Sequence, residues 1–306
     1  SHLHTQLLCL NISVQINSTC THLNLQLLKL NIFRIGNMHL SSFRQFFRAS
    51  DLKSIRTLLH CHILPGMDDG SKNMDVSVQM CRIARQNGIK HIVCTPHITT
   101  VGDIDSFVKI RNEKLRDLQG IINNLGLGIT LYPGAEVYVD DDIFFSTDLR
   151  RLAINGSRYI LVEFAFRDVS MKRIVNYLNA LIDMGLIPIV AHPERYEYFQ
   201  FDYDEVNTLI RNGVLFQINA SSLASLDGPQ EFELAYAMAY TGAASFIATD
   251  AHSSHYRMND LMNMINFFPP DISQFNMQMM VHDAAKCVLT DKEVPLINRG
   301  EIYKRG

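Results

Sequence analysis

Two histidines and two aspartates lie close together in one short stretch, HCHILPGMDDG at residues 60–70. His60 and His62 follow an apolar segment that is predicted to be a strand, and alternate residues of a strand share a face, so both imidazoles should point the same way. Asp69 comes seven residues after His62, in a turn where Gly70 is expected to supply a positive φ. The stretch alone also fits a strand end with surface histidines, but two imidazoles and a carboxylate suit a divalent metal ion.

Other metal-capable side chains follow later apolar runs of the kind that form buried strands. The motifs are CTPH, PGAE, LVEF, AHPER and ATDAH, and the side chains they place at strand ends are His97, Glu136, Glu163, His192, Asp250 and His252. Each group alone has a plainer interpretation, because a carboxylate can cap a helix and a core histidine can be satisfied by hydrogen bonds. Nine such groups at corresponding positions are hard to obtain by chance, so we expect them to form one metal site.

Apolar runs alternate with amphipathic segments along the chain after residue 51. Strands are predicted at residues 55–59, 89–95, 129–132, 159–162, 187–191, 214–218 and 245–248, and helices at 75–87, 107–125, 171–184, 203–212 and 231–240, with the last fifty residues largely helical. Strands that alternate with helices form parallel sheets. In a parallel α/β barrel the active site is built at the carboxyl ends of the strands, where these side chains are expected to lie.

The overall composition limits the possible classes of function. The chain has 306 residues, 47% of them hydrophobic, which is enough for a large core, and its net charge of −3 argues against a nucleic-acid-binding protein. Charged or polar residues interrupt every long apolar run, so no membrane span is expected. The six cysteines are scattered without a C-x-x-C pair, which favours a reducing, cytoplasmic location.

The first fifty residues differ from the rest in composition. They contain four basic and no acidic residues, whereas the remainder contains 24 basic and 31 acidic residues. Residues 1–12 recur at residues 21–32 with eight of twelve positions identical, but two copies are too few to stack into a stable repeat domain. We therefore expect residues 1–50 to be a repetitive extension and residues 51–306 to be the functional domain. A targeting segment or an amphipathic membrane-surface arm is the alternative for residues 1–50.

The six motifs, in this order and at these spacings, resemble the PHP (polymerase and histidinol phosphatase) superfamily, and within it the metal-dependent protein-tyrosine phosphatases of bacterial capsule and exopolysaccharide clusters. The resemblance runs from about residue 52 to the end. It implies a distorted (β/α)7, TIM-like barrel that holds up to three metal ions in its mouth. Manganese is the ion that the family implies, and iron or zinc would also suit nitrogen and carboxylate ligands.

The resemblance also implies roles for individual residues. One ion would be held by His60, His62, Glu136 and Asp250, a second by Glu136, Glu163 and His192, and a third by Asp69, His97 and His252. Arg195 and Arg257 match phosphate-contacting arginines of the family and, with His192 and Asp250, are the expected catalytic residues. The family commonly has an aspartate where this chain has Leu58, so we expect the imidazole of His60 to lack a carboxylate partner.

The activity implied is hydrolysis of phosphotyrosine on a protein, such as a tyrosine autokinase of capsular polysaccharide synthesis, by a metal-activated hydroxide. Cysteine catalysis is not expected, because no cysteine is followed six residues later by the arginine of a C-x5-R loop. The alternatives are a small-molecule phosphatase, for example one acting on histidinol phosphate, and an inactive barrel that serves as a scaffold. A PHP exonuclease is disfavoured by the acidic charge of residues 51–306.

A chain shortened to begin at Ser50 should keep the fold and activity of the whole chain, because the repeated, acid-free segment shares no pattern with the body. Thermal unfolding and phosphatase activity of the two chains test this directly. A shortened chain that precipitates or loses activity would show that the segment packs on the body.

Overall fold

The computed structural model describes residues 57–99, 104–141, 148–255, 258–295 and 300–303. All of these belong to one compact unit, Gln45–Gly306. The predicted extension at residues 1–50 and the candidate residue Arg257 lie outside the described residues. The division of the chain at residue 50 therefore stays a prediction.

The strands pair in parallel throughout and form two sheets. The first sheet, in the order β1-β2-β4, contains β1 (Thr57–Leu58), β2 (His91–Cys94) and β4 (Thr130–Pro133). The second, in the order β3-β5-β6-β7-β8-β9, contains β3 (His97–Ile98), β5 (Glu136–Tyr138), β6 (Tyr159–Glu163), β7 (Ile187–Ala191), β8 (Leu215–Asn219) and β9 (Phe246–Ala248). The predicted parallel α/β fold is confirmed.

The seven-stranded barrel is not confirmed, because neither sheet closes on itself or on the other through paired strands in the described residues. Two short strands that were not predicted, β3 and β5, follow β2 and β4 after breaks of two residues. An isolated parallel bridge joins Cys61, after β1, to Ala251, after β9. At the same place the backbone N–H of His62 donates to the carbonyl of Ala251 at 2.9 Å.

Helices lie between β1 and β2, β3 and β4, β6 and β7, β7 and β8, and β8 and β9. Several begin at a polar residue whose side chain caps the first turn. Asn73, Ser170 and Asp202 cap α2 (Met74–Gln86), α4 (Met171–Asp183) and α6 (Tyr203–Arg211). The others are α3 (Ile104–Asn124), α5 (Glu197–Phe201), α7 (Ala220–Leu223), α8 (Pro229–Thr241), α9 (Leu261–Ile265), α10 (Gln274–Gln278), a π-helical turn at Met279–Asp283 and α11 (Ala284–Leu289), with 3-10 turns at Leu149–Leu152, Ile154–Gly156 and Pro193–Arg195. None of the helices in the described part of the chain is long and apolar enough to cross a membrane.

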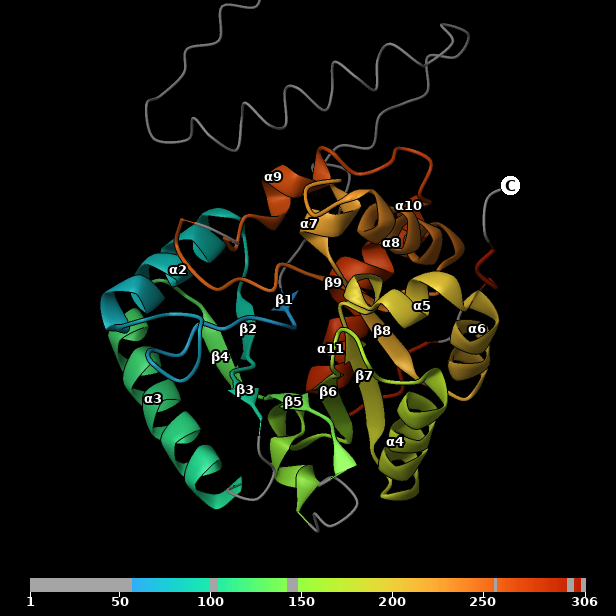
Figure 1. The fold of residues 1–306 in the computed structure, drawn as a ribbon. Coiled ribbons are helices and arrows are strands. Elements are labelled where there is room, and N and C mark those ends of the chain that lie inside the picture. The colour runs from blue at the N-terminus through green and yellow to red at the C-terminus, as the bar shows by residue number, and fades with distance from the viewer. Residues whose placement is uncertain (1–56, 100–103, 142–147, 256–257, 296–299, 304–306) are drawn as a thin grey trace, which may run out of the picture. The chain divides into compact units, whose positions relative to one another are not determined.

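The strands separate two apolar cores. Ile160 and Val162 of β6 face a larger core shared with the helices, while Tyr159 and Leu161 of the same strand face a smaller inner core, as alternate strand residues must. α2 and α3 lie on the side of β2 and β4, and α4 lies on the side of β7 (Figure 1). The inner core takes side chains from strands of both sheets and from α11: Leu59, Val93, Ile189, Leu215, Phe246, Ala284, Ala285 and Val288.

Candidate metal centre

The metal-capable side chains predicted from the sequence come together where strands end, or just after the breaks between β2 and β3 and between β4 and β5. His60 and His62 follow β1, His97 begins β3, Glu136 begins β5, Glu163 ends β6, His192 follows β7, and Asp250 and His252 follow β9. The centre runs from a buried floor to an open rim. The side chains of His60 and His62 have no exposed area, whereas the carboxylate of Asp69 is 71% exposed and lies 3.4 Å from His252 Nε2.

The imidazoles of His60 and His62 face each other through their Nε2 atoms, which are 3.0 Å apart. His60 Nδ1 lies 2.7 Å from the amide oxygen of Gln217, and His62 Nδ1 lies 2.7 Å from a carboxylate oxygen of Asp68. Both partners are acceptors, so each Nδ1 carries a proton and each ring turns its Nε2 to the centre. Although burial lowers it, hydrogen bonds to Asp250, Asp68 and Glu136 hold the pKa of His62 well above its usual range, so a metal ion that binds this nitrogen would displace a proton. Two Nε2 atoms that point at one position are the arrangement of metal ligands.

Glu136 lies where these two Nε2 atoms meet. Its Oε2 atom is 3.1 Å from His60 Nε2, 3.1 Å from His62 Nε2 and 3.2 Å from His97 Nδ1. This oxygen is buried and makes no hydrogen bond of normal geometry with any of them. Burial favours a neutral carboxyl, but the neighbouring imidazoles of His60, His192 and His62 outweigh it and hold the pKa of Glu136 well below its usual range. A buried carboxylate with an unsatisfied oxygen among imidazole nitrogens fits a divalent cation.

Three sets of side chains have ligand atoms close enough to share an ion: His60, His62, Glu136 and Asp250; His62, Asp69, His97 and His252; and His97, Glu136 and Glu163. The first set has the members expected from the resemblance, and the second contains the expected Asp69, His97 and His252. The third set contains Glu136 and Glu163 as expected, but with His97 in the place expected for His192. His192 Nε2 lies 2.9 Å from Glu136 Oε1. The assignment of each ligand to an ion, His192 included, stays a prediction.

Arg195 is the described candidate for binding phosphate. It lies in the 3-10 turn that follows His192, its side chain is 36% exposed, and its Nη1 atom is 3.9 Å from Asp250 Oδ2. A guanidinium at this position faces the centre from the rim and is open to an incoming anion.

A chain of buried amides connects Asp250 to His60. Asn219 Nδ2 donates to Asp250 Oδ2 at 3.1 Å, and Gln217 Nε2 donates to Asn219 Oδ1 at 2.9 Å, so the oxygen of Gln217 is turned to His60 Nδ1. Because a carboxylate only accepts, this chain determines the orientation of both amides and the tautomer of His60. Gln217 and Asn219 were not identified from the sequence. The one available signal was a pair of polar residues in the apolar run of β8.

The partner of the second ring nitrogen of His60 is not a carboxylate, as expected from Leu58. The amide oxygen of Gln217 takes that role instead. Leu58 is fully buried in the larger core, on the opposite face of its strand from Leu59. The imidazole is therefore oriented from β8, a strand distant in sequence, and the apolar residue at position 58 does not leave it free.

The turn at residues 68–70 supports His62. Asp68, which the sequence did not single out, accepts a hydrogen bond from His62 Nδ1, and its Oδ1 and Oδ2 atoms accept from the backbone N–H groups of Gly70 and His97. Although burial raises it, these hydrogen bonds lower the pKa of Asp68 to about 2. Gly70 does not adopt the positive φ that we expected. A Cβ at Gly70 would lie 2.4 Å from the Cβ and the carbonyl oxygen of His62, so glycine is required by close approach.

Two of the metal-capable residues have strained backbones. His192 has a φ of 33° and Asp250 a φ of 49°, in the left-handed region that residues with a side chain seldom adopt. Such a conformation costs about 1–3 kcal/mol per residue and persists where the surroundings impose it. Both residues turn their side chains from a strand end into the centre.

The cysteines near the centre are unsuited to nucleophilic chemistry. Cys61 lies between the two histidines in sequence but is fully buried, and burial raises the pKa of its thiol to about 12. Burial also raises the pKa of Cys81, Cys94 and Cys287. Thiols that stay protonated at neutral pH are poor nucleophiles and poor metal ligands.

Comparison with known proteins identifies the family. Residues 57–290 match the family model described as capsular polysaccharide synthesis, CpsB/CapC. This chain belongs to the CpsB/CapC family. CapC of Staphylococcus aureus is 34% identical over 213 residues, which cover 68% of this chain and 81% of CapC. The tyrosine-protein phosphatase YwqE of Bacillus subtilis is 30% identical over 196 residues, covering 64% of this chain and 76% of YwqE.

A solved structure within the CpsB/CapC family shares the fold. It comes from crystallographic work on YwqE of Bacillus subtilis and CpsB of Streptococcus pneumoniae, described as metal-dependent tyrosine phosphatases. It matches with a TM-score of 0.70 at 25% identity and covers 81% of this chain and 100% of that chain. The likeness to a metal-dependent enzyme and the His and carboxylate sets described above indicate a metal cofactor.

Replacing Gln217 with leucine should weaken manganese binding about 10- to 100-fold, because His60 Nδ1 then lacks the acceptor that determines its tautomer. Manganese affinity is measured by isothermal titration calorimetry on protein whose fold is verified by circular dichroism. Gln200→Leu is a matched control, since Gln200 donates to the backbone carbonyl of Glu194 outside the amide chain. Unchanged affinity in folded Gln217→Leu would refute the role of the amide chain.

Replacing Leu58 with aspartate tests whether a carboxylate at position 58 can reach His60. The new carboxylate would lie unpaired in the larger core, so the thermal midpoint should fall while manganese affinity does not improve. Tighter manganese binding in a folded Leu58→Asp protein would show that position 58 can reach the imidazole after all.

Proposed function

We propose that this chain is a metal-dependent protein-tyrosine phosphatase that hydrolyses phosphotyrosine on a protein, such as a tyrosine kinase of capsular or exopolysaccharide synthesis. The observation that carries the proposal is the convergence of the imidazole nitrogens of His60 and His62 on the buried Glu136, with Arg195 at the rim. Relatives named tyrosine-protein phosphatases and the metal-dependent structural neighbour support it.

Up to three ions would be held by the nine side chains predicted from the sequence. Manganese is the ion that the resemblance implies, and iron or zinc would also suit nitrogen and carboxylate ligands. When bound, such ions provide a nucleophile from water at neutral pH and neutralise the charge on the phosphoryl oxygens. The protein's own contribution is to orient the Nε2 atoms of His60 and His62 toward the centre through Gln217 and Asp68.

Arg195 would bind the phosphate through its planar guanidinium, which can donate two parallel hydrogen bonds to phosphoryl oxygens. Asp250 and His192 are also proposed as catalytic residues, because both direct their side chains into the centre from strained backbone positions at strand ends. Arg257 is proposed as a second phosphate contact on the basis of the resemblance alone, because it lies outside the described residues.

We also infer that the strands form the distorted (β/α)7 barrel expected from the resemblance. β3 and β5 continue the chain just beyond β2 and β4, so the strands occupy seven successive positions. The bridge between Cys61 and Ala251 lies between the first and the last position, and the inner core gathers side chains from both sheets. These features support a closed arrangement with local breaks in strand pairing.

Two alternative functions can be distinguished from the proposed one. A small-molecule phosphatase, for example one acting on histidinol phosphate, would use the same centre, so turnover of a phosphotyrosine peptide and of histidinol phosphate must be compared. The inactive-scaffold hypothesis rested on Leu58, and the partner that Gln217 gives to His60 removes its basis.

Phosphotyrosine hydrolysis should be lost after chelation, return when manganese is added, and survive iodoacetamide. The reason is that the centre has no thiolate and burial keeps the pKa of Cys61 near 12. Release of phosphate from a phosphotyrosine peptide measures all three states. Full activity in chelated protein, or inactivation by the thiol reagent alone, would contradict the proposal.

Asp250→Ala and His192→Ala should abolish turnover, and Arg195→Ala should lower kcat/KM about 100-fold or more, because Arg195 donates to the charge that develops on the phosphoryl group. Arg211→Ala is the matched control, since Arg211 is an exposed arginine paired with Glu301. Wild-type kinetics in a folded Asp250→Ala or His192→Ala protein would overturn the assignment of that residue.

A further inference from the structure

A partly exposed aromatic side chain lies beside the candidate metal centre. Phe166 comes three residues after Glu163, in the loop between β6 and α4, and is 41% exposed. An exposed phenylalanine lacks the burial that ordinarily stabilises such a residue. Single exposed apolar residues are common on protein surfaces, so it is the position of Phe166 beside the centre that makes it relevant to binding.

Phe166 contacts the segment that carries His192 and Arg195. The guanidinium carbon of Arg195 lies 4.8 Å from the centroid of the Phe166 ring, and the ring of His192 is 6.0 Å away. Tyr196 stacks on Phe166 with centroids 5.4 Å apart and an interplanar angle of 26°. Tyr196 is itself fully buried, and its hydroxyl accepts from the backbone N–H of Phe164 at 3.2 Å. Phe166 therefore rests on a rigid support and keeps part of its ring open.

The geometry of an aryl phosphate brings its ring to this part of the rim. In phosphotyrosine one ester oxygen separates the phosphorus from the ring. With the phosphate at Arg195, this one-atom link keeps the ring in the neighbourhood of that guanidinium. Phe166 is in direct contact with the same guanidinium. Two aromatic rings at centroid distances of about 4.5–7 Å attract each other beyond the effect of burial alone.

We propose that Phe166 is a specificity-determining residue that contacts the ring of the substrate and so selects aryl phosphates over alkyl phosphates. This inference rests on the proposed phosphatase function and adds to it the side chain that recognises the aromatic leaving group. The same contact holds the guanidinium of Arg195 at the rim by a cation–π interaction. Loss of ring recognition would weaken the binding only of ligands that carry a ring. A displaced Arg195 would weaken the binding of ligands with and without a ring.

The test uses two phosphate analogues that differ in their organic group, phenylphosphonate and methylphosphonate. Their dissociation constants from the manganese-loaded full chain are measured by isothermal titration calorimetry, which does not depend on turnover. In Phe166→Leu the dissociation constant for phenylphosphonate should rise about 3- to 10-fold, the range expected for loss of an aromatic pair. The constant for methylphosphonate should change by less than about 2-fold.

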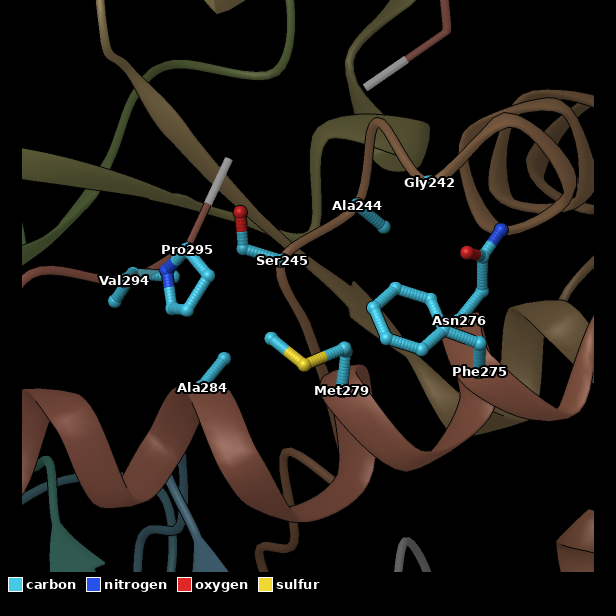
Figure 2. A pocket seen from close by; sticks show the side chains of 9 residues that line it. All are labelled: Gly242, Ala244, Ser245, Phe275, Asn276, Met279, Ala284, Val294 and Pro295. Carbon is cyan, nitrogen blue, oxygen red and sulfur yellow. The ribbon is translucent and has the colours of Figure 1, made fainter. Parts of the chain in front are cut away.

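Two further variants serve as controls. Phe166→Tyr keeps the ring and should keep the preference for phenylphosphonate. Phe275→Leu makes the same change at a phenylalanine of similar exposure, 46%, on α10. Figure 2 shows Phe275 lining a hollow with Gly242 and Ser245, which precede β9, at the opposite end of that strand from Asp250. Phe275→Leu should bind both analogues as the wild type does.

Three outcomes would overturn the proposal. An equal rise for both analogues in Phe166→Leu would mean that the residue acts only through Arg195, and no change for either would mean that the ring is not contacted. A loss of preference in Phe166→Tyr would also contradict ring recognition. Hydrolysis of a phosphotyrosine peptide by the wild type tests the proposed function separately, so failure of one proposal can be told from failure of the other.

Discussion

The structure depends on the convergence of two buried imidazoles on one buried carboxylate. His60 Nε2 and His62 Nε2 are 3.0 Å apart, and both are 3.1 Å from the same oxygen of Glu136. The hydrogen bonds at the Nδ1 atoms hold both rings in place, because turning either ring would leave a buried acceptor unpaired. A metal ion at the point of convergence would bind all three groups and compensate the burial of the carboxylate.

The need to hold both imidazoles in this arrangement explains why polar residues of β8 next to His60 are buried. Gln217 and Asn219 are enclosed within β8, and each makes a hydrogen bond on both sides, so their burial is compensated. The left-handed backbones of His192 and Asp250 are stabilised by the same packing. The centre thus draws its ligands and their supports from strands of both sheets, and parallel pairing brings all of them to one edge.

Much of the fold follows from local patterns. The apolar run at residues 187–191 is β7, and the amphipathic run predicted at residues 171–184 is α4, because periodicity and the cap at Ser170 act over a few residues. β3 and β5 are too short to give a pattern. The partner of His60 was missed because it lies 157 residues away in sequence, and the role of Gly70 because a close approach to His62 depends on tertiary packing. Candidate ligands could be found from residue type and strand ends, whereas their supporting residues could not.

The most direct test of this account is the position of bound manganese, located by anomalous X-ray scattering in crystals of the manganese-loaded protein. The account predicts a peak at the point where the Nε2 atoms of His60 and His62 meet Oε2 of Glu136, with the Nδ1 atoms still bonded to Gln217 and Asp68. Crystals grown in excess manganese with no peak at that point, or with either imidazole turned so that Nδ1 faces the centre, would contradict it.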